Sequence, residues 1–144
     1  MKTMKYIKTN KDSKTPEYKS NEAAGADMYT LSEVTIKPSE LVMINTGIET
    51  EIPKGYFGML APRASFCLKL HLDMPHSVGI IDSDFRGEIL VPLRNLGKKK
   101  IVIAKGERIA QLIILPYLKV KYMESKKLNT TVRGKGGFGS TGKF

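Results

Sequence analysis

Acidic residues are concentrated in one short segment that could carry chemistry, residues 79–89 (GIIDSDFRGEI). Asp82, Asp84 and Glu88 stand there with Arg86, between two apolar runs. Carboxylates held in a turn can orient a water molecule or hold a hydrated cation. A plainer interpretation is that the acids and the glycine form an ordinary polar turn. This segment taken alone is compatible with both.

Cationic and amide side chains occur in two other segments. In residues 61–65 (APRAS), Arg63 stands near the hydroxyl of Ser65, a combination suited to binding phosphate. An exposed loop arginine would look the same. Gln111 alternates onto the same strand face as apolar neighbours, so it lies either at a wet edge or at a position where a polar group has a purpose.

The net charge of +10 is spread unevenly along the 144 residues. Residues 94–144 hold thirteen Lys and Arg against two Glu, whereas residues 1–93 hold eleven basic and twelve acidic residues. Such asymmetry favours a nucleic acid, an acidic membrane surface or a polyphosphate ligand as partner. A solvated basic face is the alternative without a partner.

Short apolar segments alternate with turn signals, the pattern of a mainly β barrel or sandwich. Residues 41–44 and 47–52 are predicted as separate strands. Residues 80–81 and 88–94 are predicted as the two arms of a hairpin around the acidic turn, and residues 118–123 as the last strand.

Helical composition is confined to residues 65–71, which predict one or two helical turns. From residue 126 onward apolar residues become rare and glycine accumulates, so this part is predicted to be a flexible arm. The expected organisation is a β domain at residues 1–125 and an arm at residues 126–144.

Several classes of protein are disfavoured by composition. No apolar run approaches the ~18 residues of a membrane span, and the basic start of the chain has no apolar stretch behind it. We therefore expect no membrane segment and a cytoplasmic location, with a nuclear or viral setting left open. The single cysteine, Cys67, excludes an internal disulfide and a multi-cysteine metal site. With His71 it could suggest a nucleophile pair, but a buried core cysteine is the favoured interpretation.

Five short segments occur in a fixed order along the chain. They are residues 23–28 (AAGADM), 61–65 (APRAS), 79–89 (GIIDSDFRGEI), 106–112 (GERIAQL) and 133–142 (RGKGGFGSTG). Together they resemble, nearly residue for residue, the five ordered motifs of the trimeric dUTP pyrophosphatases (dUTPases). The third and fifth motifs are highly specific as a pair.

The resemblance implies a jelly-roll-type β-barrel with one short helix and a glycine-rich C-terminal arm. It implies a homotrimer in which each active site draws motifs from all three chains. The implied reaction is hydrolysis of dUTP to dUMP and pyrophosphate, with Mg²⁺ held on the triphosphate. This activity limits uracil incorporation into DNA and supplies dUMP for dTMP synthesis.

The resemblance also implies roles for residues of the third motif and its surroundings. Asp82 would orient the water that attacks the α-phosphorus, and Phe85 would lie against the sugar and exclude a ribose 2′-hydroxyl. The base would be read by His76 and by the backbone at Gly79 and Ile81.

The remaining implied residues contact the rest of the nucleotide. Asp27 would join the metal indirectly, through water and phosphates. Phe138 of the arm would stack on the uracil, and Arg133 would meet the γ-phosphate. The full set of implied phosphate contacts is Arg63, Ala64, Ser65, Gln111, Arg133, Gly137, Ser140 and Thr141.

Three positions depart from the family pattern. Ala64 stands where the second motif usually has serine, and losing one such donor typically costs on the order of 10²-fold in rate. His76 stands where many members have asparagine, and either contacts the base or is an ordinary surface histidine. Phe85 replaces a commoner tyrosine, which keeps the ring and loses the hydroxyl.

Three other functions remain as alternatives. Ala64 suggests a catalytically weakened protein that binds dUTP for regulation. The basic second half suggests a nucleic-acid binder, although its aromatic residues are not spaced as a stacking platform, and no specific nucleic acid is expected. The related dCTP deaminases share the implied fold but need a glutamate in place of the aspartate pattern around Asp82.

Overall fold

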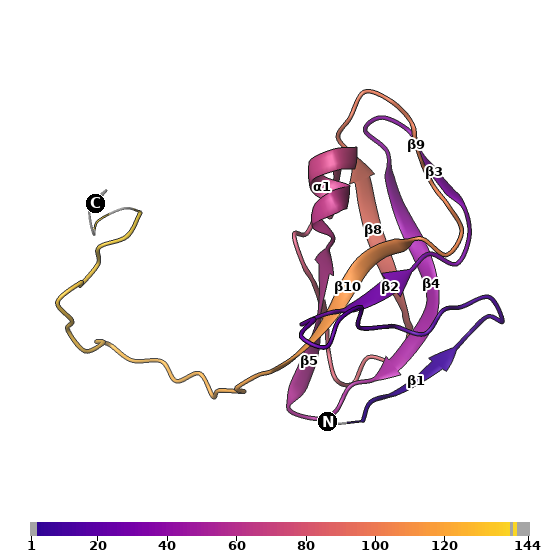
Figure 1. Ribbon diagram of the computed structural model, residues 1–144. Coiled ribbons are helices and arrows are strands. Elements are labelled where there is room, and N and C mark those ends of the chain that lie inside the picture. Colours follow the sequence, from indigo (N-terminus) through magenta and orange to yellow (C-terminus); the bar gives the residue numbers. More distant parts are fainter. Residues whose placement is uncertain (1–2, 139, 141–144) are drawn as a thin grey trace.

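The computed structural model describes residues 3–138 and 140, which form two four-stranded antiparallel sheets, a two-stranded ribbon and one short helix (Figure 1). One four-stranded sheet has the order β1 (Lys5–Lys8), β4 (Leu41–Glu51), β8 (Glu88–Asn95) and β6 (Leu72–Asp73). The other has the order β2 (Ala26–Tyr29), β10 (Arg108–Pro116), β5 (Tyr56–Pro62) and β7 (Gly79–Ile81). A two-stranded ribbon joins β3 (Val34–Ile36) to β9 (Ile101–Ile103), and α1 spans Ala64–Leu70. The predicted mainly β class with one short helix is confirmed.

The core lies between the two sheets and follows the two-residue period of the strands. Along β8 every second side chain is buried, including Ile89, Val91 and Leu93. From the opposite sheet, Leu60 and Leu112 are each about 1% exposed and belong to the same cluster. Burial of alternate positions explains why the sequence alternates apolar and polar residues in these segments.

The predicted hairpin around the acidic turn is wrong. β7 pairs with β5, with Ile81 opposite Gly58, whereas β8 pairs with β4 and β6 in the other sheet. Residues 82–87 therefore carry the chain from one sheet to the other. Two apolar runs around a turn look alike in sequence whether they pair with each other or with distant strands.

The predicted break between residues 44 and 47 is also wrong, because β4 runs through it as one strand. Pairing with β8 is irregular between Asn45 and Glu49, and Gly47 has a φ of +66°. A Cβ at Gly47 would lie 2.0 Å from Ser13 Oγ. The glycine thus accommodates an irregularity within the strand rather than ending it.

Beyond β10 the chain leaves the body and runs outward (Figure 1). Residues 118–123, predicted as a strand, form no strand in the described chain, and Tyr122 is 92% exposed. A strand needs a partner, and none reaches this segment within one chain. The start of the arm at residue 126 stays a prediction. Among the described residues, no helix is long and apolar enough to cross a membrane.

Candidate functional site

Two arginines converge on one aspartate at the end of the β2–β10–β5–β7 sheet. Arg108 Nη1 lies 3.0 Å from Asp27 Oδ2, and Arg63 Nε lies 3.6 Å from Asp27 Oδ1. The Asp27 side chain is 13% exposed, and those of Arg63 and Arg108 are 22% and 41% exposed. We name Asp27, Arg63, Arg108 and Gln111 the basic cluster.

Strand register brings these residues together. β10 lies between β2 and β5, and Gln111 stands opposite Asp27 on one side and Ala61 on the other. Gln111 Nε2 donates to the carbonyl of Pro62 at 3.3 Å, and Arg63 Nη1 donates to the carbonyl of Arg108 at 2.9 Å. Segments separated by more than thirty residues therefore meet in one chain.

A glycine keeps the space that the amide of Gln111 occupies. A Cβ at Gly25 would lie 2.9 Å from Gln111 Oε1 and 3.1 Å from Gln111 Cβ. Gln111 is half-buried, and its amide donates to the backbone of the neighbouring strand. It is thus a positioned polar group and not a side chain at a wet edge.

The charge balance of the basic cluster favours an anion. Two guanidinium groups share one carboxylate, which leaves an excess of one positive charge in a half-buried setting. Guanidinium groups recognise phosphate oxygens with directed hydrogen bonds. The cluster can therefore bind a polyphosphate.

A second charged pair lies beside β2, next to the basic cluster. A hydrogen bond from Lys19 is the main cause that lowers the pKa of Glu17, and the same bond raises the pKa of Lys19. Tyr29 also donates to Glu17, at 3.2 Å. The backbone of Glu17 also forms a bridge with Asp27. This bridge tethers the loop before β2 to the site.

The helix α1 begins at the basic cluster. Arg63 is its N-cap residue, without a side-chain capping bond, and its extended backbone turns the chain from β5 into the helix. Ala64 is exposed, while Ser65 is half-buried and its hydroxyl makes no hydrogen bond within the described part of the chain. The hydroxyl of Ser65 is therefore available to a ligand.

The structure does not bring Asp82 to the basic cluster. Asp82 follows Ile81, which stands opposite Gly58, so it lies at the level of Phe57. Four residues along β5 separate Phe57 from Ala61, or roughly 13 Å at the rise of a strand. Asp82 lines a groove of about 600 Å³ together with Asp84, Phe57 and residues of the segment 117–122, which follows β10.

The predicted base and sugar residues of the body, which leave out Phe138, lie before and within this turn along the chain. Phe85 is 43% exposed, Gly79 is buried and Ile81 is half-buried. The imidazole of His76 covers Gly79, since a Cβ there would lie 3.1 Å from His76 Nε2. Within the ranges described, no group of three or more His, Cys, Asp and Glu residues could hold a metal ion.

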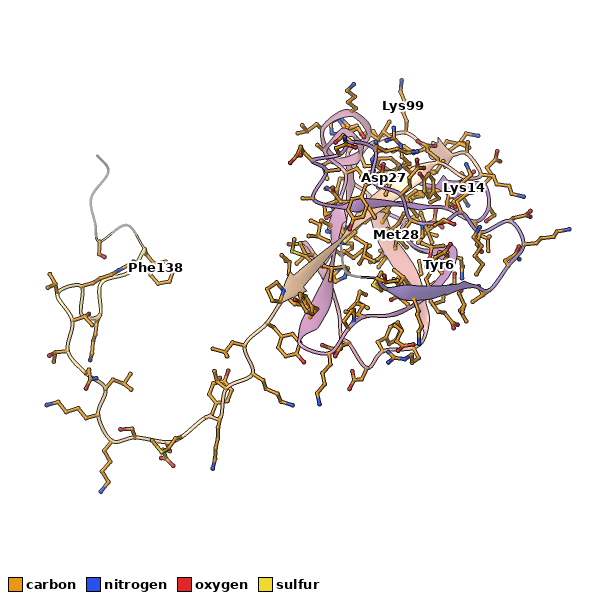
Figure 2. The ribbon with its side chains drawn as sticks, turned by 60° about the horizontal axis from the view of Figure 1, so that its bottom comes forward. Tyr6, Lys14, Asp27, Met28, Lys99 and Phe138 are labelled. Atoms are coloured by element: carbon orange, nitrogen blue, oxygen red, sulfur yellow. The ribbon has the colours of Figure 1, made fainter. Side chains whose placement is uncertain are left out.

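The predicted arm residues lie far from the body (Figures 1 and 2). Arg133 Nε donates to the carbonyl of Gly136 at 3.0 Å, and the amide of Ser140 donates to the carbonyl of Gly137 at 3.0 Å. Phe138 is fully exposed and has a φ of +47°. Thr141 lies outside the described residues.

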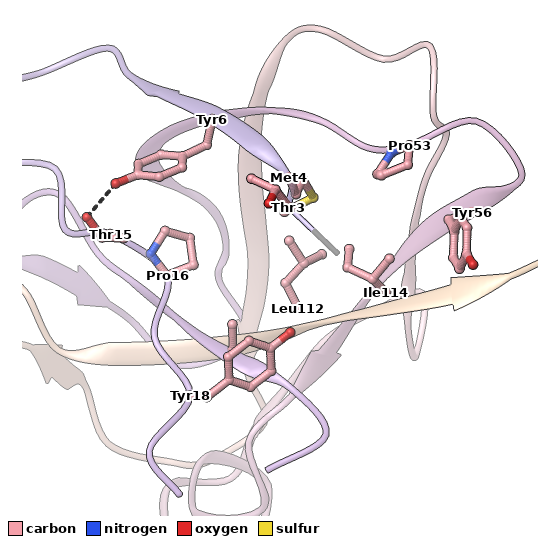
Figure 3. Close-up of a pocket in the computed structure, with 11 residues that line it drawn as sticks. Thr3, Met4, Tyr6, Thr15, Pro16, Tyr18, Pro53, Tyr56, Leu112 and Ile114 are labelled. Carbon is pink, nitrogen blue, oxygen red and sulfur yellow. Dashed lines mark hydrogen bonds between the residues drawn. The ribbon is translucent and has the colours of Figure 1, made fainter. Parts of the chain in front are cut away.

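An apolar pocket of about 420 Å³ opens elsewhere, beside β1 (Figure 3). Tyr6 and Thr15 hydrogen-bond through their hydroxyls at 2.9 Å on its rim, and Leu112 and Ile114 line it. None of the described residues that line it carries a charge. These residues therefore do not supply the cationic donors that the basic cluster offers to a polyphosphate.

The sequence did not predict that Arg108 belongs to the site, and it predicted a greater burial of Cys67 than the structure shows. The fourth motif contains Arg108, but its role depends on the register that places it opposite Tyr29, beside Asp27. Cys67 is half-buried rather than fully buried, and His71 ends the helix with a left-handed φ of 53°. No hydrogen bond among the described residues links the two side chains.

The sandwich, the basic cluster and the separate acidic turn define a polyphosphate-binding β protein. The family model described as dUTPase matches residues 11–142. A deoxyuridine 5′-triphosphate nucleotidohydrolase of Hydrogenobaculum sp. is 46% identical over 136 residues, 94% of each chain. One from Nautilia profundicola is 42% identical over 140 residues, 97% of this chain and 99% of the relative.

A solved structure agrees with these relatives. The Staphylococcus bacteriophage 80alpha dUTPase with dUPNHPP superposes with a TM-score of 0.92 at 26% identity, covering 99% of each chain. The matched part therefore includes the outward-running segment after β10. The chain belongs to the dUTPase family.

Proposed function

We propose that this protein hydrolyses dUTP to dUMP and pyrophosphate at sites completed between three copies of the chain. The observation that carries the proposal is the basic cluster of two arginines and Gln111 around Asp27. It supplies directed donors for a triphosphate in a protein of the dUTPase family.

A homotrimer is supported by what one chain lacks. Asp82 stands roughly 13 Å along the sheet from the basic cluster, too far for one α-phosphorus to meet both. Residues 118–138 run outward and expose apolar side chains, Tyr122 among them. A second copy would supply the acidic turn to the basic cluster, and a third copy would supply the arm.

Asp82 would act on the attacking water. Its carboxylate lines an open groove and makes no ion pair within the described residues, so it is free to accept a proton from water. The water would attack the α-phosphorus in line, and the bond from that phosphorus to the bridging oxygen would break. Arg63, Gln111 and Ser65 would stabilise the charge that develops on the pyrophosphate.

The base would be read by a strand edge. β7 is the edge strand of its sheet, so one side of its backbone at Gly79–Ile81 has no partner in the described chain. Unpaired amide and carbonyl groups can match the hydrogen-bonding edge of uracil. His76 lies over Gly79 and would close the base pocket from the side.

Mg²⁺ would be carried by the triphosphate. Both carboxylate oxygens of Asp27 already face guanidinium groups, so this residue suits contact through water rather than direct coordination. No cage of three acidic or imidazole groups exists in the described ranges, which fits a metal held mainly by phosphates. When bound, the ion would polarise phosphoryl oxygens.

The arm would close over the nucleotide of a neighbouring copy. Arg133 would reach the γ-phosphate, Phe138 would stack on uracil, and the amide of Gly137 with the hydroxyl of Ser140 would donate to phosphates. A role for Thr141 and a cytoplasmic location remain predictions.

Pyrophosphate release from dUTP, UTP, dCTP and dTTP, measured with Mg²⁺ present, tests the proposal. We expect release from dUTP alone, and its loss in Asp82→Asn with unchanged thermal stability. Equal release from UTP would contradict sugar selection, and ammonia release from dCTP would indicate a deaminase.

One alternative is a protein that binds dUTP for regulation and turns it over poorly. Ala64 favours it, because this exposed position at the start of α1 lacks the hydroxyl usual in the family. Tight binding of dUTP with negligible pyrophosphate release, restored by Ala64→Ser, would select this alternative.

A further inference from the structure

The turn at residues 82–87 holds its own arginine in an unexpected place. Arg86 Nη1 donates to the carbonyls of Ser83 and Phe85, each at 2.8 Å. Asp82 and Asp84 lie within four residues, yet none of the ion pairs among the described residues involves Arg86. The guanidinium therefore binds the backbone of the turn and leaves its carboxylates free.

The remaining bonds fix the turn at both ends. The amide of Phe85 donates to the carbonyl of Asp82 at 3.1 Å, which closes a four-residue turn. At the far end, the Glu88 carboxylate accepts from the amide of Gly47 at 2.6 Å and from Asn45 Nδ2 at 3.1 Å. Between these anchors Arg86 is the only side chain of the described residues that bonds the carbonyls on both sides of Asp84.

Gly87 leaves the space that the Phe85 ring occupies. A Cβ at Gly87 would lie 3.1 Å from Phe85 Cε2 and 2.7 Å from Phe85 Cζ, and the second distance is closer than real Cβ atoms approach. Gly87 is not among the residues with a positive φ, so the reason for glycine here is space and not backbone conformation. Any side chain at this position would displace the ring.

We propose that Arg86 and Gly87 are positioning residues that hold the Phe85 ring where it selects deoxyribose over ribose. The proposal rests on the proposed function and on the role that the family resemblance implies for Phe85, which is contact with the sugar. Arg86 fixes the carbonyl of Phe85 itself, and Gly87 admits the ring against the backbone. Sugar selection then depends on two residues that do not touch the sugar.

The ratio of kcat/KM for dUTP to that for UTP tests the proposal. This ratio does not change with the fraction of folded enzyme, because both substrates meet the same active molecules. We expect Gly87→Ala and Arg86→Ala to lower it by about 10-fold to 10²-fold, since small misplacements near a reacting centre have effects of this size. Arg86→Lys, which keeps a cationic donor, should retain more of the ratio than Arg86→Ala.

Two controls make the result specific. Arg94→Ala removes an arginine near the opposite end of β8, which pairs with Asp73 at 2.9 Å, and should leave the ratio unchanged. Adding Gly87→Ala to a Phe85→Ala background should have no further effect on the ratio, because the ring through which Gly87 acts is gone. A ratio within about twofold of wild type in Gly87→Ala, or a further loss in the double variant, would overturn the proposal.

A measurement without substrate separates this proposal from the proposed function. Because the Phe85 ring lies against Gly87, the Hα resonances of that glycine should carry a ring-current shift in the NMR spectrum of the wild-type protein. The shift should disappear in Phe85→Ala and shrink in Arg86→Ala. Its absence in the wild type would overturn the positioning argument, whereas failure to hydrolyse dUTP with the shift present would count against the proposed function.

Discussion

Replacing Asp27 by asparagine removes the charge on which the basic cluster is built. The substitution keeps the shape of the side chain and leaves Arg63 and Arg108 facing each other without a carboxylate. Breaking a buried ion pair by removing one partner costs about 3–5 kcal/mol, and breaking an exposed one about 0–1 kcal/mol. The cost at this site depends on how far the side chains of its ion pairs are buried.

The side-chain exposures place it near the middle. Asp27 and Arg63 are 13% and 22% exposed, so their pair is partly buried, whereas Arg108 at 41% is close to a surface partner. We expect Asp27→Asn to lower the free energy of unfolding by about 2.5 kcal/mol. For a chain of this length that is a fall in Tm of roughly 5–10 °C.

Thermal unfolding at a fixed protein concentration measures this effect, because assembly makes Tm concentration-dependent. The control is Asp12→Asn, which removes an ion pair to Lys105 of 2.8 Å whose side chains are 43% and 57% exposed. We expect the control to change stability by at most about 0.5 kcal/mol. Equal effects of the two substitutions would refute the argument that burial, and not distance, gives the Asp27 pairs their strength. With Arg63 no longer oriented, kcat/KM for dUTP should fall by about 10²-fold.

Three more predictions follow from individual features. Ala64→Ser should raise kcat for dUTP by about 10²-fold, with Ala104→Ser as an exposed control, and an unchanged kcat would show that position 64 does not limit turnover. Removing all residues after Lys126 should abolish turnover while the mass in light scattering stays that of a trimer, and full activity would refute the role of the arm. The bond to Lys19 lowers the pKa of Glu17 from 4.5. The contribution of Glu17 to the free energy of unfolding is therefore present above pH 4.5 and is lost as the pH falls below that value. The Tm difference between wild type and Glu17→Gln should therefore vanish at low pH. The pKa of Lys19 is raised from 10.5, so the contribution of Lys19 to the free energy of unfolding is lost as the pH rises above that value.

Local sequence patterns were sufficient for the class of fold and for most of the elements. Period-two alternation predicts β8 because its side chains face core and solvent in turn. A short segment with helical composition after Arg63 predicts α1. These features depend on neighbours a few residues away, which the sequence records directly.

Pairing between distant strands was not predictable in this way. β7 and β8 flank one turn but join different sheets, and only contacts of high sequence separation decide which strand each of them pairs with. For the same reason the sequence did not indicate that Arg108 would share Asp27 with Arg63. The sequence also did not indicate the distance along β5 that separates the basic cluster from Asp82.

The sequence by itself determined the mainly β class, the ordered motifs and the residue types able to bind a triphosphate. The tertiary structure alone decided that Asp27, Arg63, Arg108 and Gln111 meet in a single chain, while Asp82 lies at the other end of the sheet. It also decided that Arg86 binds carbonyls and that Gly87 makes room for the Phe85 ring. The physical reason is that motif order follows the chain, whereas proximity follows strand register, and register is set by the burial of side chains from strands far apart in sequence.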